Sequence, residues 1–307
     1  MTPNGKSAII TLFLLMLLGL IMKKRGVLHA KAEQSIVRLI QGYAVPALLI
    51  RNVTTQFTKD FLAQNALILA VSALSILVAL FLAEVLGRIV QIPPKDRGVF
   101  DVMFAFSNTI FVGVPVISGI FGDKGIPYLM LYYLMNTLLF WTLGISLIRK
   151  DTGSSWVSFS SLKRLFNPAM LGFFIGLFLL YTDTILPDPL NKSLDLLAQL
   201  VTPLSTLYMG SVLADLRLGR APFFSSTLLI LFGRFVFVPA TTLFLLTALG
   251  FSGLLVEVLV VTSALPVMAQ ASVMAGHYGK DNTYAALMTA LTTFLFLFAV
   301  PFYFRFF

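Results

Sequence analysis

Long runs of apolar residues recur along the whole chain and are separated by short polar segments. Each run holds about 20 residues, which is enough for a helix to cross a hydrocarbon core of roughly 30 Å. Backbone amides in that core find no water, so a helix must satisfy them internally. A transmembrane β-barrel would show shorter segments of alternating polarity, whereas runs such as LILAVSALSILVALFLAEVL do not alternate. The pattern predicts an all-α polytopic membrane protein.

The apolar runs predict ten transmembrane helices. Their approximate ranges are 7–24, 32–51, 61–87, 98–121, 125–148, 165–184, 191–214, 222–250, 253–277 and 281–304. The segments between them are short, and the longest, 149–164, is rich in Ser, Gly and basic residues. We therefore expect residues 1–307 to form a single integral membrane unit without a soluble domain.

Composition narrows the function classes. Only 11% of the residues are charged, against roughly 25% in an ordinary soluble domain. The net charge of +9 would suggest nucleic-acid binding only if it formed a patch on a soluble domain, so we expect no nucleic-acid partner. The absence of cysteine excludes disulfides and thiolate metal sites. With two histidines and no HExxH motif, no metal site or cofactor is expected.

Basic residues predict the orientation in the membrane, because cytoplasmic loops carry an excess of Lys and Arg. Most of them follow predicted helices 1, 3, 5, 7 and 9, namely Lys23, Lys24, Arg25, Lys31, Arg88, Lys95, Arg97, Arg149, Lys150, Lys163, Arg164, Arg217, Arg220 and Lys280. The first apolar run precedes its positive charges, which argues against a signal peptide. We expect a multi-pass protein of the cell (inner or plasma) membrane with both termini outside.

The two halves of the chain resemble each other. Predicted helices 4 and 9 end in ISGIFG and MAGHYG, each followed by an Asp/Lys pair and another apolar helix. Helices 2 and 7 each carry a proline near the middle, Pro46 and Pro203. These similarities predict two five-helix repeats, at approximately residues 7–148 and 165–304. Because five is odd, the second repeat must be inverted, and inverted repeats are typical of secondary transporters.

Helices 4 and 9 also carry residues that interrupt a helix. Helix 4 contains Asn108 and Thr109 followed by Gly113 and Pro115, and helix 9 contains Pro266 followed by Gln270. A simple proline kink is one interpretation. Two prolines at corresponding positions favour broken helices that cross, whose N-terminal ends would attract an anionic group.

Three motifs carry a resemblance to a known family: SNTIFVGVP in helix 4, NPAMLGFFIGL at the start of helix 6, and ALP in helix 9 followed by Tyr278. In this order and spacing they resemble the auxin efflux carrier family, over nearly the whole chain. Helix 9 has Val267 and Ala271 where plant members have a glutamine and a second proline. The long central loop of many plant members is also missing, so the chain is similar to the short bacterial type.

The resemblance implies a ten-helix fold shared with bile acid sodium symporters, in which helices 4 and 9 cross at Pro115 and Pro266. It implies a scaffold formed by helices 1, 2, 6 and 7 and a mobile transport domain formed by helices 3–5 and 8–10. It also implies that the substrates are small organic anions, and it suggests a homodimer. Asn108 matches the substrate-contacting asparagine of plant members.

Other polar residues within the predicted helices are few. Arg234 is deep in helix 8, where it could pair with a carboxylate or contact an anionic substrate. Asn136 and Gln41 could line a pathway or form interhelical hydrogen bonds. Glu84 and Arg88 are spaced for an i,i+4 ion pair.

These patterns favour a secondary carrier of small organic anions, such as mono- or dicarboxylates, working by alternating access with an elevator-like motion. Its candidate substrate-binding residues are Asn108, Thr109, Gly113, Pro115, Asn136, Arg234, Pro266 and Gln270. A sodium-coupled symporter of the bile acid type and a membrane receptor or sensor remain alternatives. An enzyme is not expected, because no catalytic pair occurs at bilayer depth.

Overall fold

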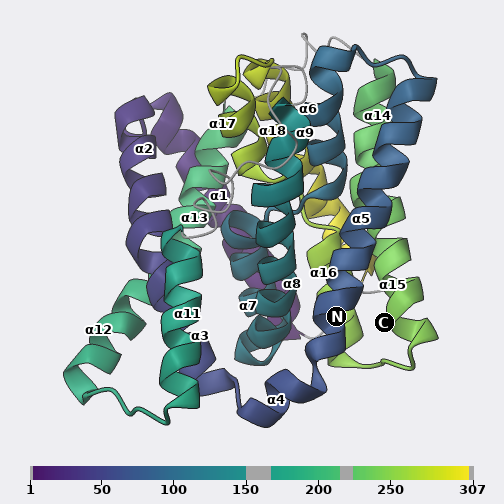
Figure 1. Cartoon of the computed structure of the whole chain (residues 1–307). Helices are drawn as coiled ribbons and strands as arrows, with labels where there is room; N and C mark the ends of the chain where they lie inside the picture. The colour runs from purple at the N-terminus through teal and green to yellow at the C-terminus, as the bar shows by residue number, and fades with distance from the viewer. Residues whose placement is uncertain (1–2, 150–166, 215–223, 304–307) are drawn as a thin grey trace.

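The computed structural model of the chain describes residues 3–149, 167–214 and 224–303 (Figure 1). Every regular element in these ranges is a helix, and a single antiparallel bridge joins Ser107 to Val267. Within the described ranges, six helical stretches are long and apolar enough to cross a membrane: Ala30–Gln56, Ala66–Ile89, Thr109–Arg149, Asp188–Ala214, Ser225–Ala248 and Thr283–Tyr303. Two further apolar helices, Pro168–Tyr181 and Leu254–Ser263, are shorter. The predicted all-helical, multi-pass class is confirmed at this level.

The helices follow one another in this order. The first part of the chain contains α1 (Pro3–Lys24), α2 (Ala30–Leu39), η1 (Ile40–Ala44), α3 (Val45–Gln56), α4 (Lys59–Gln64), α5 (Ala66–Ile89), α6 (Pro94–Ala105), η2 (Thr109–Gly113), α7 (Val114–Phe121), η3 (Gly122–Gly125), α8 (Ile126–Leu139), η4 (Phe140–Gly144) and α9 (Ile145–Arg149). The second part contains α11 (Pro168–Tyr181), α12 (Asp188–Gln199), α13 (Val201–Ala214), α14 (Phe224–Phe232), η7 (Gly233–Phe237), α15 (Val238–Ala248), α16 (Leu254–Ser263), α17 (Ala269–His277) and α18 (Asn282–Tyr303).

Several runs that read as continuous helices contain a π-helical segment. Three such segments, η1, η2 and η7, end directly before a Val-Pro pair, with Pro46, Pro115 and Pro239 at the second residue of the next helix. Proline has no amide hydrogen, and its ring clashes with the carbonyl of the preceding turn. Widening that turn by one residue relieves the clash and keeps the helix running.

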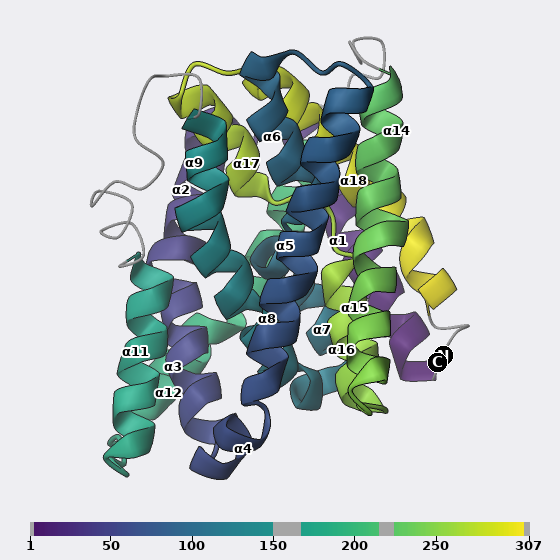
Figure 2. The same cartoon turned by 45° about the vertical axis from the view of Figure 1, so that its right-hand side comes forward.

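The helices pack in several contacting sets. Helix α1 lies along α13, and α3 lies along α11 and α12. Helix α5 contacts α6, α8 and α15, α15 contacts α16, and α17 contacts α18, while α1 and α13 both contact α7. Figures 1 and 2 show α3, α11 and α12 on the left side of the molecule and α14 and α15 on the right.

Glycines allow α11 to approach α3 closely. A Cβ atom placed on Gly172 would lie 2.6 Å from the Cα atom of Pro46, and one on Gly176 would lie 2.9 Å from the Cβ atom of Val53. The GFFIG segment therefore packs α11 against α3 within the chain, as small residues do in membrane helix interfaces.

One ion pair lies near the C-terminal end of α5. Arg88 and Glu84 form the i,i+4 pair expected from their spacing, with a nitrogen–oxygen distance of 2.6 Å. The basic segments that contain Lys150, Lys163, Arg164, Arg217 and Arg220 lie outside the described residues.

Candidate substrate site at the helix breaks

Two helices are interrupted in the middle of the bundle, and the interruptions contact each other. One helix stops at Ala105 and resumes at Thr109, and the other stops at Ser263 and resumes at Ala269. A bridge joins Ser107 to Val267. In addition, the amide of Asn108 donates to the carbonyl of Pro266 at 2.9 Å, and the amide of Met268 donates to the carbonyl of Phe106 at 3.2 Å. The extended segments thus pair in antiparallel orientation.

Side chains from neighbouring helices satisfy the backbone of both breaks, as buried polar groups require. The Asn136 side chain accepts from the amide of Ser107 at 3.0 Å and donates to its carbonyl at 3.1 Å. The hydroxyl of Thr292 accepts from the amide of Val267 at 3.1 Å. Asn136 is fully buried, so the structure gives it the interhelical bonding that the sequence left open.

Arg234 lies behind the breaks and is 0% exposed. Its Nε atom donates to the carbonyl of Leu265 at 3.0 Å. Its Nη1 atom donates to the carbonyls of Phe104 and Ala105 at 3.2 and 2.7 Å. Its Nη2 atom donates to the hydroxyl of Ser107 at 2.6 Å and to the carbonyl of Ser263. The acceptors of these bonds are carbonyl and hydroxyl oxygens at the ends of α6 and α16.

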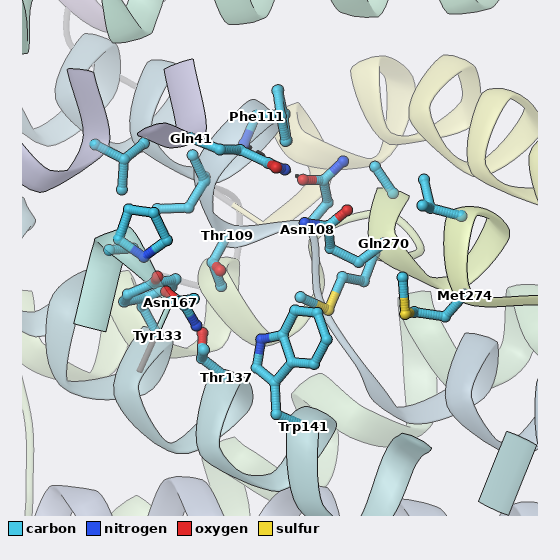
Figure 3. Close-up of a pocket in the computed structure, with 17 residues that line it drawn as sticks. Gln41, Asn108, Thr109, Phe111, Tyr133, Thr137, Trp141, Asn167, Gln270 and Met274 are labelled. Carbon is cyan, nitrogen blue, oxygen red and sulfur yellow. Dashed lines mark hydrogen bonds between the residues drawn. The ribbon is translucent and has the colours of Figure 1, made fainter. Parts of the chain in front are cut away.

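A cavity of about 340 Å³ lies on the other side of the breaks (Figure 3). Its walls come from η1 and the start of α3, from the start of α11, and from η2, α8, η4 and α17. It is lined by Gln41, Val45, Asn108, Thr109, Ile110, Phe111, Tyr133, Thr137, Trp141, Asn167, Pro168, Ala169, Met268, Ala269, Gln270, Val273 and Met274. The cavity therefore lies between η1, α3 and α11 on one side and η2, α8, η4 and α17 on the other.

The structure brings only some of the expected site residues to the cavity. Asn108, Thr109 and Gln270 line it, and Gln41 joins them from η1. Figure 3 shows the side chains of Asn108, Thr109 and Gln270 around the centre of the cavity and the indole of Trp141 below them.

The remaining candidates support the breaks instead of lining the cavity. The carbonyl of Pro266 binds the amide of Asn108, and Pro115 lines a separate space of about 20 Å³. A Cβ atom on Gly113 would lie 2.7 Å from the Cδ1 atom of Leu265, so glycine permits close packing there.

Several lining residues were missed in the sequence. Tyr133, Thr137 and Trp141 are spaced by four residues, so they form one stripe along α8 and η4. That spacing was a usable signal in the sequence. Asn167 begins the NPAML segment, and its side-chain oxygen accepts from the amide of Met170 at 3.0 Å as an N-cap.

The polar groups of this largely apolar cavity are neutral side chains and helix ends. None of the lining residues among the described part of the chain carries a formal charge. The side-chain oxygen of Asn108 accepts from the amide of Phe111 at 3.3 Å, whereas α17 begins at Ala269 and its N-cap residue, Met268, forms no side-chain cap. The first amides of a helix have no intrahelical partner and carry partial positive charge. Two helix N-terminal ends thus border the same cavity.

The chain is similar to known proteins along nearly its whole length. A family model described as "Membrane transport protein" matches residues 6–304. An uncharacterized transporter of Methanothermobacter thermautotrophicus is 25% identical over 306 residues, which cover 97% of both chains. An uncharacterized transporter of Methanocaldococcus jannaschii is 26% identical over 292 residues, which cover 93% of both. The matched family confirms the resemblance that the motifs indicated.

Proposed function

Because the chain belongs to the membrane transport protein family, we propose that it is a secondary carrier of small organic anions that works by alternating access. The observation that carries this proposal is the cavity of about 340 Å³ at the helix breaks. Asn108, Thr109 and Gln270 offer neutral hydrogen-bonding groups beside two helix N-terminal ends, and such ends favour anions.

The architecture proposed for the carrier is a ten-helix, five-plus-five inverted repeat with crossing broken helices. Gly122 and Gly279, which end the two similar segments ISGIFG and MAGHYG, have φ angles of +65° and +67°. In Figures 1 and 2, α6 and α7 run downward whereas α16 and α17 run upward. The break in each half also bonds to a side chain of the following helix, Asn136 or Thr292. These correspondences support the inversion.

The proposed motion displaces one set of helices, the transport group, relative to another set, the scaffold. The scaffold would be α1 to α3 and α11 to α13, and the transport group would be α5 to α9 and α14 to α18. Gln41 and Asn167 belong to the first group, whereas Asn108 and Gln270 belong to the second. A displacement of the second group would therefore carry its half of the site away from the scaffold and expose it to the other side of the membrane.

A single negative charge suits this site better than two. The described lining residues provide helix ends, amides and hydroxyls without a fixed cation, together with Phe111, Tyr133 and Trp141 as apolar surface. We therefore propose a monocarboxylate with an apolar body as the preferred class, with dicarboxylates as weaker ligands.

Transport in proteoliposomes tests the function. An anion that crosses without a counter-ion carries charge, and each charge is worth about 2.3 kcal/mol per 100 mV. We expect uptake of monocarboxylates to increase when a potassium diffusion potential makes the interior positive. Sodium and proton gradients are varied separately at fixed voltage.

Three outcomes would contradict this proposal in different ways. Uptake that ignores voltage but stops without sodium would favour a sodium-coupled symporter. Binding of an anion without any uptake would favour a receptor. Absence of both binding and uptake across mono- and dicarboxylates would reject organic anions as the substrate class.

The proposed topology has its own test. Because the native chain has no cysteine, single cysteines can be introduced at positions 6, 307 and 95 without interference. We expect an impermeant maleimide added outside intact cells to label positions 6 and 307 but not 95. Labelling only after permeabilisation at either terminus would overturn the orientation and the odd-numbered repeat.

A further inference from the structure

Arg234 is a buried arginine that does not line the cavity, and its position bears on the ion coupling of the proposed carrier. Its side chain is completely buried in η7, in a helix that contributes nothing to the cavity wall. Burying a charge in this way is costly unless every donor finds a partner. The surroundings of Arg234 meet that condition.

All the hydrogen-bonding capacity of the guanidinium is used by the protein. A guanidinium has five N–H donors, and five acceptors surround this one: the carbonyls of Phe104, Ala105, Ser263 and Leu265 and the hydroxyl of Ser107. No donor is left for a substrate in this arrangement. Arg234 therefore acts on the helix breaks themselves.

The acceptors lie at the C-terminal ends of two half-helices. Helix α6 ends at Ala105 and helix α16 ends at Ser263, where unpaired carbonyls and the helix dipole give partial negative charge. In carriers with broken helices, such carbonyls are the groups that coordinate a coupling cation. In this chain a guanidinium fills that environment.

The neighbouring residue shows how closely this side chain is fitted. A Cβ atom on Gly233 would lie 2.5 Å from the ring of Phe104. Glycine at this position therefore lets η7 approach the end of α6 closely enough for Arg234 to reach both helix ends. A permanently charged group is covalently held there, so unlike a free ion it cannot leave the site.

We propose that Arg234 is a resident cation that takes the place of a mobile coupling ion at the C-terminal ends of α6 and α16, so that the carrier does not require sodium. It also ties the two broken helices together, because each of them supplies acceptors to the same guanidinium. This inference rests on the proposed transport function but is tested without a transported substrate.

The first arm of the test measures the thermal stability of the wild-type protein in detergent. Sodium is replaced by choline at constant ionic strength, in the absence of any organic anion ligand. We expect the Tm to stay unchanged, because the cation site is already occupied. A saturable rise in Tm with sodium would overturn the proposal.

The second arm restores the missing cation chemically. Arg234→Ala removes the guanidinium, and we expect a lower Tm that millimolar ethylguanidinium raises again, while the same compound does not raise the Tm of the wild-type protein. Arg88→Ala is the matched control, since Arg88 is an exposed arginine paired with Glu84, and it should show no rescue. Unchanged stability of Arg234→Ala would overturn the proposal.

A conservative variant keeps the test decisive if Arg234→Ala does not fold. Arg234→Lys retains the charge with fewer donors, so we expect a lower Tm that remains independent of sodium. A sodium-stabilised Arg234→Lys protein would show that the site still needs a mobile ion. Failure of all anions in the transport assay, with a sodium-independent Tm, would reject the proposed substrate class and leave the role of Arg234 intact.

Discussion

Replacing Asn108 with aspartate is expected to abolish anion binding while the protein remains folded. The side chain lines the cavity, and its oxygen already accepts from the amide of Phe111, a bond that a carboxylate forms at least as well. A negative charge about 4 Å from a bound anion costs on the order of 4 kcal/mol at an effective dielectric constant near 20. We therefore expect the affinity, measured by isothermal titration calorimetry, to fall by at least about a hundredfold.

Two control variants distinguish the effect of the added negative charge on anion binding from a general effect on the structure. Asn65→Asp makes the same change at the N-cap of α5, which does not line the cavity, and we expect unchanged affinity. Asn108→Ala removes the amide without adding charge and should weaken binding less than Asn108→Asp but more than Pro46→Ala in α3. Equal affinity in Asn108→Asp and the wild-type protein would place the substrate elsewhere.

Replacing Gly210 with valine is expected to separate α1 from α13. A Cβ atom on Gly210 would lie 1.9 Å from the carbonyl oxygen of Met16, and one on Gly19 would lie 2.1 Å from that of Leu207. The two backbones thus touch directly, and no side chain can rotate away from a backbone clash. Overpacking usually costs about 1–3 kcal/mol, and a clash with backbone should reach the upper end. We expect the Tm to fall by roughly 5 °C.

Gly42→Ala is the control for this loss of packing. A Cβ atom on Gly42 meets nothing within 4 Å, so the substitution should leave the Tm within about 1–2 °C of the wild-type value, as surface changes of under about 0.5 kcal/mol do. A similar fall in Tm for Gly42→Ala and Gly210→Val would mean that the contact between α1 and α13 is not the cause.

Much of this architecture could be predicted from local features of the sequence. Apolar runs of sufficient length predict helices, because backbone N–H and C=O groups in lipid must form their hydrogen bonds within the protein. Pro115 and Pro266 marked the two regions where the helices are interrupted, since proline removes a donor and clashes with the preceding turn. Asn108, Thr109 and Gln270 lie next to those breaks in the sequence, and all three line the cavity, whereas their contact with a substrate stays a prediction.

The rest depended on contacts between residues far apart in the chain. Gln41 and Asn167 reach the cavity only because α3 packs against α11, and no local pattern records that packing. Arg234 could equally have met a carboxylate, a substrate or backbone oxygens, because the acceptors that it binds are carbonyls exposed by helix breaks in two other segments. Sequence by itself determined the all-helical, multi-pass class, the two regions where helices are interrupted and the family. Only the tertiary structure decided which groups face the cavity and which hold the breaks together, because main-chain carbonyls are the same in every residue and acquire a role only when helix ends meet.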